Sequence, residues 1–178
     1  LNTLYDILFD EKSLNSLSYG IFWMQSLIEA FMEILSMITG NKKERMKRAV
    51  IELGLLKYIQ KWLSSIFPTK RMRACHTIGL IGSREQATLL TLKLNDFNPK
   101  VVSSAIIALG EIRALETLPA LFTYYYHCTL QHAWLISAIC PFFGHDVYKY
   151  MRPLLTDKNL PNNKRLLLIK AIAVSPVI

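Results

Sequence analysis

The chain has 178 residues, of which 52% are hydrophobic, and it carries a formal net charge of +8 at pH 7. Such a chain can bury a sizeable core, either as one domain or as an array of small repeats. The three cysteines, Cys75, Cys128 and Cys140, have neither metal-type nor disulfide-type spacing, which speaks against a disulfide framework. We predict buried thiols, a reducing compartment and a cytoplasmic location. Because the chain begins and ends within apolar segments, we also expect it to be part of a longer protein, whose flanking sequence would allow association with a membrane.

The first 41 residues are predicted to form amphipathic helices that cap the rest of the chain. The stretch 17–40 is apolar enough to raise the question of a membrane span. However, Gln25, Glu29 and Glu33 fall on one side of a helix there, and two carboxylates would be costly in hydrocarbon. The opposite side carries apolar residues at intervals of three and four, namely Ile21, Met24, Ile28, Phe31, Leu35 and Ile38. We therefore expect a helix that covers a core or a partner and stops at Gly40-Asn41.

Residues 42–178 are predicted to be an array of helix pairs. The second helix of each pair is expected near 43–54, 70–82, 98–113, 131–143 and 162–174, and shorter first helices near 55–66, 84–95, 115–128 and 146–156. Strand-type alternation is missing, so the class is all-α. Asn98 and Thr69 are the expected N-caps of two second helices. One register position of the second helices is held by small residues, which predicts close approach of a neighbouring helix: Gly54, Gly79, Gly110, Cys140 and Ala173.

The successive positions of this small residue are separated by 25, 31, 30 and 33 residues, which is the length of a helix-turn-helix repeat. The sequence NPKVVSSAIIALGEIRALETLPAL resembles a HEAT repeat of the short type found in phycobilisome lyases. The resemblance is closest over 70–125, extends over 42–178 and does not include 1–41. Val102 stands near a position where that family frequently has arginine, and Arg113-Ala114 replace its usual Gly-Asp. The resemblance implies an α-solenoid of stacked antiparallel helix pairs, an armadillo-like superhelix.

Motifs that carry catalysis are not found: the chain has no phosphate loop, Gly-x-Ser-x-Gly or His-Glu-x-x-His. We therefore predict no catalytic residue, no metal site and no cofactor. The histidines and cysteines between His127 and His145 are of ligand type, but their spacing favours packing over metal binding. Three consecutive tyrosines cannot all face one core, so we predict that at least one is exposed and that they are a possible aromatic contact: Tyr124, Tyr125 and Tyr126.

Positive charge is concentrated in one part of the chain. Residues 42–100 contain 13 Lys and Arg against four acids, while the remaining residues have a net charge of −1. Two clusters open second helices, so we expect them to form one basic edge that binds a partner or polyanion. Its predicted residues are Lys42, Lys43, Arg45, Lys47, Arg48, Lys70, Arg71 and Arg73.

These features predict a non-catalytic module for protein–protein interaction or scaffolding. One alternative is nucleic-acid binding in a basic groove like that of the HEAT-like alkylpurine DNA glycosylases, although Trp62 and Trp134 cannot be matched with an acid to that motif. Another is contact with an anionic membrane surface. The basic side chains could also serve only to keep the protein dissolved. The resemblance to phycobilisome lyases would imply attachment of a bilin, but no residue can be given that role. No small-molecule substrate is implied.

Overall fold

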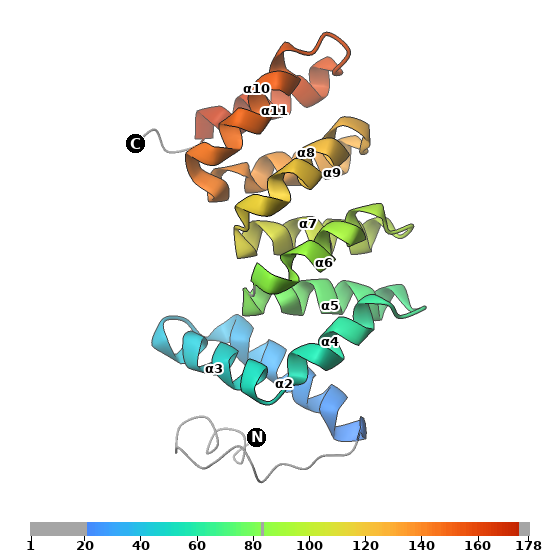
Figure 1. Cartoon of the computed structure of the whole chain (residues 1–178), viewed down its shortest axis with the longest axis vertical. Helices are drawn as coiled ribbons and strands as arrows, with labels where there is room; N and C mark the ends of the chain where they lie inside the picture. The colour runs from blue at the N-terminus through green and yellow to red at the C-terminus, as the bar shows by residue number, and fades with distance from the viewer. Residues whose placement is uncertain (1–20, 83, 175–178) are drawn as a thin grey trace. The chain divides into compact units, whose positions relative to one another are not determined.

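We describe a computed structural model of the protein over residues 21–82 and 84–174 (Figure 1). All regular structure in these residues is helical, which confirms the all-α class. The chain divides into two units, one up to Lys61 and one from Trp62 onward, whereas the sequence suggested a boundary after residue 41. Within the described residues, no helix has the length and apolar character needed to cross a membrane.

The N-terminal unit contains α2 (Ile21–Met37) and α3 (Asn41–Glu52), which pack against each other, and most of α4 (Leu55–Leu63). Ile28, Phe31 and Leu35 of α2 are buried while Glu29 and Glu33 are exposed, so its described side chains form the predicted amphipathic helix. The side chains of Ile21, Met24 and Gln25 lie outside the described residues. The helix ends at Met37, and Gly40 turns the chain with a φ of 64°.

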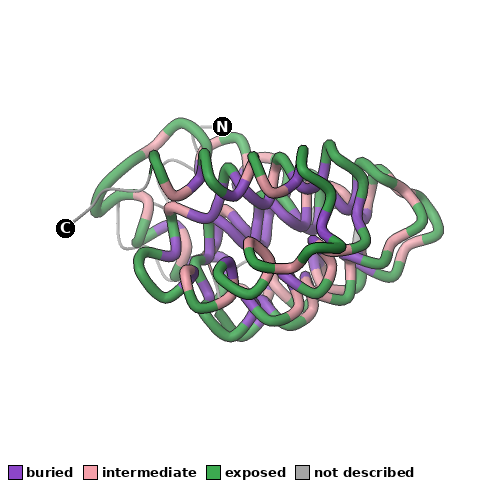
Figure 2. The backbone as a smooth tube through the Cα atoms, turned by 90° about the horizontal axis from the view of Figure 1, so that it is seen from above, coloured by how far each residue is buried: buried purple, intermediate pink, exposed green. Residues whose placement is uncertain are grey.

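The C-terminal unit contains a layer of four helices: α5 (Pro68–Ile81), α7 (Pro99–Ile112), α9 (Leu130–Ile139) and α11 (Asn162–Val174). Each packs against the next in the layer (Figure 1). The helices between them are α6 (Ala87–Leu92), flanked by short 3-10 turns, α8 (Leu118–His127) and α10 (Tyr148–Thr156). Figure 2 shows that buried and exposed residues alternate along the helices, as expected when each helix turns one side to its neighbours.

The α-helix predicted for 131–143 ends earlier, at Ile139, and continues as the 3-10 segment Cys140–Val147. Pro141 has no N–H to donate, and Gly144 has a φ of 63°, so an α-helix cannot continue through this segment. Cys140 therefore lies just beyond α9, where it is buried.

Small residues allow close helix contact at two of the five predicted positions. A methyl group placed on Gly79 would lie 2.8 Å from Cα of Ala108, and one placed on Gly110 would lie 2.8 Å from Cβ of Ile139. Both distances are too short for a real contact, so α5, α7 and α9 can approach this closely only because these residues are glycine.

The prediction of close contact is wrong for Gly54 and Ala173. Gly54 has a φ of 66° with no atom near its missing Cβ, so it is needed for the backbone turn between α3 and α4 rather than for packing. Ala173 is exposed. The same small residue type at one sequence register thus serves different purposes in different pairs.

Candidate functional site

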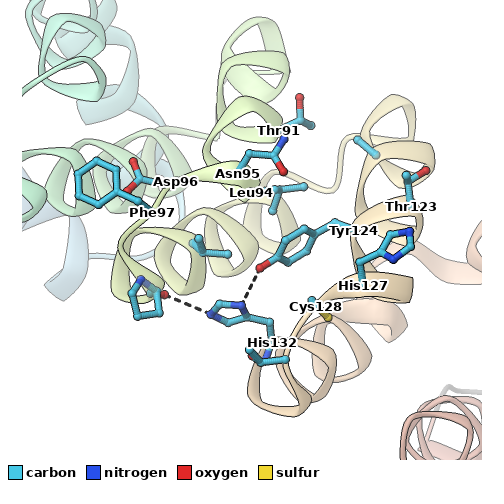
Figure 3. Close-up of a pocket in the computed structure, with 14 residues that line it drawn as sticks. Thr91, Leu94, Asn95, Asp96, Phe97, Thr123, Tyr124, His127, Cys128 and His132 are labelled. Carbon is cyan, nitrogen blue, oxygen red and sulfur yellow. Dashed lines mark hydrogen bonds between the residues drawn. The ribbon is translucent and has the colours of Figure 1, made fainter. Parts of the chain in front are cut away.

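The N-terminal ends of α5, α7 and α9 are bordered by two grooves, both within the C-terminal unit. The larger, which we call the His132 groove, encloses about 610 Å³ between the turn before α7, the end of α8 and the start of α9 (Figure 3). The smaller, the Arg71 groove, encloses about 530 Å³ between the turn before α5 and the turn before α7. Both grooves are lined by Asn95, Asp96 and Phe97, so this turn forms the wall between them.

A recurring side-chain contact shapes the turns that lead into α5, α7 and α11. Ser65 Oγ accepts a hydrogen bond from Phe67 N at 3.2 Å, Asp96 Oδ1 from Asn98 N at 2.9 Å, and Asp157 Oδ1 from Asn159 N at 2.8 Å. Each turn is followed by a proline in or next to the first helical turn, where a missing N–H costs nothing. The turns therefore have a similar local geometry and start the helices in a similar way.

The N-cap prediction is confirmed for Asn98 and wrong for Thr69. Asn98 Oδ1 accepts from Lys100 N at 3.0 Å. The N-cap of α5 is Phe67, which has no side-chain acceptor, and Thr69 lies inside the helix because Pro68 already occupies its first turn. Thr129, which the sequence analysis did not single out, caps α9 by accepting from His132 N at 3.4 Å.

His132 is buried at the bottom of its groove, with both ring nitrogens engaged. Nε2 lies 3.2 Å from the carbonyl oxygen of Pro99, and Nδ1 lies 2.7 Å from the Tyr124 hydroxyl, as the dashed lines in Figure 3 mark. Because a carbonyl can only accept, Nε2 donates to Pro99, and in the tautomer with its proton on Nε2 the other nitrogen, Nδ1, accepts from Tyr124. Burial raises the pKa of Tyr124 to about 12, which keeps this donor protonated. With both nitrogens paired, the imidazole links α9 to the start of α7 and has no free position for a metal or a proton transfer.

Arg71 lines the Arg71 groove, and its guanidinium makes four hydrogen bonds. Its guanidinium donates to both carboxylate oxygens of Asp96, at 2.7 and 2.8 Å, and to the carbonyls of Ser65 and Ile66 at 2.8 and 3.1 Å. These hydrogen bonds raise the pKa of Arg71 and lower that of Asp96. The guanidinium carbon also lies 4.5 Å from the centre of the Phe97 ring. Arg71 therefore ties two successive turns together.

A third buried side chain ties α11 to the end of α8. Lys164 is buried, and its Nζ donates to the carbonyls of Tyr125 and Tyr126 at 3.1 and 2.9 Å. The Tyr125 hydroxyl donates back to the Lys164 carbonyl at 2.8 Å. Arg71, His132 and Lys164 thus each make a polar contact between successive helix pairs at the N-terminal ends of the layer. The role of His132 and Lys164 could not be predicted from the sequence, because their partners in the neighbouring helix pair are backbone carbonyls, which leave no pattern in the sequence.

The predicted basic set is only partly on the surface. Lys42, Arg45 and Arg48 of α3 are exposed, as is Arg73 of α5, while Lys43 and Lys70 are half-buried. Lys47 Nζ pairs with Glu44 at 3.0 Å. Arg71 was expected to contact a partner, but it is buried and bound to Asp96, so it is not available on the surface.

The aromatic prediction also needs correction. Tyr125 is completely buried, and Tyr124 and Tyr126 are half-buried, so none of the three is fully exposed. Tyr125 cannot touch a partner because it fills the core between α8, α9 and α11. Among the residues whose burial the structure describes, the exposed Phe, Tyr and Trp side chains are instead Phe67, Phe97, Trp134 and Phe142.

The three cysteines are buried and free of disulfides, as predicted. Burial raises the pKa of Cys75 and of Cys140 to about 12 and also raises that of Cys128. Nucleophilic attack requires a thiolate, so these thiols are suited to packing rather than reaction. Across residues 21–82 and 84–174, no three His, Cys, Asp or Glu side chains gather in a way that would hold a metal ion.

No protein-family model and no curated protein matches the sequence.

Proposed function

We propose that the chain is a HEAT-like α-solenoid. Two observations support this proposal: α5, α7, α9 and α11 form one layer in which each helix contacts the next, and similar turns precede α5, α7 and α11. Gly79 and Gly110 give further support, because each allows close packing onto the following helix of the layer. Small-angle X-ray scattering tests the architecture. A distance distribution with a long tail is expected for stacked pairs, and a symmetric distribution would contradict the proposal.

We further propose that this solenoid binds another protein and does not catalyse a reaction. The observation that carries the proposal is that α3 is amphipathic. Its basic residues Lys42, Arg45 and Arg48 are exposed, while Met46 and Val50 are buried. A helix with a basic outer face attracts an acidic surface. The candidate nucleophiles and ligands support the same function, since the cysteines and His132 are buried and used internally.

Charge reversal tests whether the basic residues bind an acidic partner. The pairs Arg45→Glu/Arg48→Glu on α3 and Lys70→Glu/Arg73→Glu on α5 should each reduce retention on heparin. Arg71 has to be left unchanged, because reversing a buried paired charge would damage the fold. Lys149→Glu/Lys158→Glu is a matched control, since both lysines are exposed and lie outside residues 42–100. Unchanged retention of both test variants, with native circular dichroism, would contradict the proposal.

The remaining alternatives are separated by the choice of ligand. A mobility shift with duplex DNA and a salt series would reveal phosphate contacts by a steep salt dependence. Sedimentation with anionic and neutral vesicles tests the membrane alternative. The groove beside Trp134 does not favour a glycosylase, because its lining among the described residues includes Lys170 and no carboxylate.

A further inference from the structure

Large apolar side chains are exposed around the turns that precede α5 and α7. Phe97 is 82% exposed, Ile66 81%, Leu92 65% and Phe67 56%. Three of them, Ile66, Leu92 and Phe97, line the Arg71 groove, so they belong to one surface rather than being scattered. Single exposed apolar residues are common, but a group that borders a groove is typical of a site that binds another protein.

Phe97 is exposed but held in place. One face of its ring lies 4.5 Å from the Arg71 guanidinium, which is itself fixed by Asp96 and by two backbone carbonyls. The backbone before and after the ring is also fixed, because Asp96 accepts from Asn98 N and Asn98 caps α7. An aromatic side chain that is already oriented loses less entropy on binding, which is a property of interface hot spots.

The surroundings of this aromatic residue are positively charged. Much of the lining of the two grooves comes from three segments, 62–71, 91–100 and 123–132. These segments contain four Lys and Arg and only one carboxylate. That carboxylate, Asp96, is neutralised by Arg71. Lys93 lines the Arg71 groove, and Lys100 follows Pro99, which lines the His132 groove. A partner that enters these grooves therefore meets apolar surface flanked by lysines.

We propose that the two grooves form a docking site for an extended acidic segment of a partner protein, with Phe97 as the central apolar contact. This proposal rests on the proposed protein-binding function and deepens it by naming the site and the chemistry of the partner. The segment lies across the Asn95–Phe97 wall and places large apolar side chains into the grooves on either side. Its carboxylates face Lys93 and Lys100. Alternating acidic and apolar residues suit this arrangement, because successive side chains of an extended peptide point to opposite sides.

A synthetic peptide tests the proposal with the whole protein. The probe is a fluorescein-labelled peptide of about twelve residues in which glutamate alternates with leucine and phenylalanine. A second peptide has lysine in place of every glutamate. By fluorescence anisotropy, the protein should bind the acidic peptide and not the basic one, and physiological salt should weaken the complex relative to low salt.

Two variants at the grooves and two control variants elsewhere test where the acidic peptide binds. Phe97→Ser and the pair Lys93→Glu/Lys100→Glu should each weaken binding of the acidic peptide by about tenfold or more. Leu115→Ser and Arg84→Glu also change one exposed apolar and one exposed basic residue, but they lie beyond the C-terminal ends of α7 and α5. They should leave the affinity unchanged. Circular dichroism and thermal unfolding check that each variant is folded.

The results of these binding measurements distinguish failure of the proposed docking site from failure of the proposed protein-binding function. If the acidic peptide binds Phe97→Ser as tightly as the original protein but loses affinity for Arg45→Glu/Arg48→Glu, the docking site is wrong and the protein-binding function stands. If neither set of variants affects the peptide, or if the original protein binds both peptides equally, the docking site is wrong. If the protein binds duplex DNA with a steep salt dependence and does not bind the acidic peptide, the docking site and the protein-binding function are both wrong.

Discussion

Arg71 and Asp96, which are 25 residues apart in the sequence, form a bidentate ion pair, and both side chains are only 5% exposed. The pair joins the start of α5 to the turn before α7, and Nη1 of the guanidinium donates to the carbonyls of Ser65 and Ile66. Every charged atom of the pair is thus satisfied, which is the condition under which a buried ion pair is tolerated. Removing one member leaves the other charge buried without its partner.

Asp96→Ala should therefore destabilise the protein by about 3 kcal/mol, the usual cost of breaking a buried pair from one side. The double variant Arg71→Met/Asp96→Leu should cost less than Asp96→Ala, because neither side chain then buries a charge. Urea unfolding followed by circular dichroism measures both. A double variant less stable than Asp96→Ala would show that loss of the ion pair itself, and not the burial of an unpaired charge, dominates the cost.

The pair also predicts how stability depends on pH. Arg71 lowers the pKa of Asp96, so the folded protein releases this proton more readily than the unfolded chain. The contribution is complete above the unfolded-state pKa, near 3.9, and is lost as the pH falls through the lower pKa of the folded state. The difference in unfolding free energy between the original protein and Asp96→Asn should therefore shrink as the pH is lowered from 6 toward about 2. A difference that stays constant over this range would contradict the assignment.

Helix positions in the C-terminal unit follow closely from the sequence, but the use of individual residues does not. The regular spacing of apolar residues and the Asn98-Pro99 start were sufficient to predict α7. Arg71 was assigned to the surface because it stands in a run of basic residues, and its partner Asp96 lies in another turn. Sequence periodicity identifies a buried face by its apolar residues, so it misses a cation that is buried by pairing.

Glycine substitutions should separate the two uses of glycine in this fold. Gly110→Ala should destabilise the protein by about 1–3 kcal/mol, because the added methyl group overlaps Ile139. Gly54→Ala meets no neighbouring atom and should cost about 1 kcal/mol, because alanine is strained at a φ of 66°. Thermal unfolding of both variants provides the comparison.

A second substitution identifies the cause of the first effect. Ile139→Ala removes side-chain atoms that the new methyl group would meet, so the loss in Gly110→Ala/Ile139→Ala should be smaller than the sum of the two single losses. Full additivity would mean that the two residues do not compete for the same space.

The cysteines should react slowly in the folded protein. Burial raises the pKa of Cys75 and Cys140 to about 12, so few of these thiols ionise at pH 8. Labelling with a chromogenic disulfide reagent should proceed rapidly only after denaturation, when all three thiols become accessible. Fast labelling of one thiol under native conditions would identify a reactive cysteine that burial argues against.

The Tyr125 hydroxyl should stabilise the contact between α8 and α11. Tyr125→Phe removes its hydrogen bond to the Lys164 carbonyl and its 3.3 Å contact with Ser137, at a cost of about 1 kcal/mol. Hydrogen exchange in α11 should increase more than in α7, because the lost bond lies at the start of α11. Tyr148→Phe, a half-buried tyrosine on α10, serves as the control. Equal increases in all helices would indicate a global rather than a local effect.

Gly110 has a consequence at the other end of its helix. It lets α7 and α9 touch near their C-terminal ends, whereas at their N-terminal ends His132 bonds to the Pro99 carbonyl beside the His132 groove. From Pro99 to Gly110 the helix rises about 16 Å, so the contact at the glycine lies far from the His132 groove. Because Gly110 sets how closely α7 and α9 approach, it also bears on the spacing of the groove walls, although it could touch nothing bound there. A change at Gly110 would alter what the groove accepts without altering a single lining side chain.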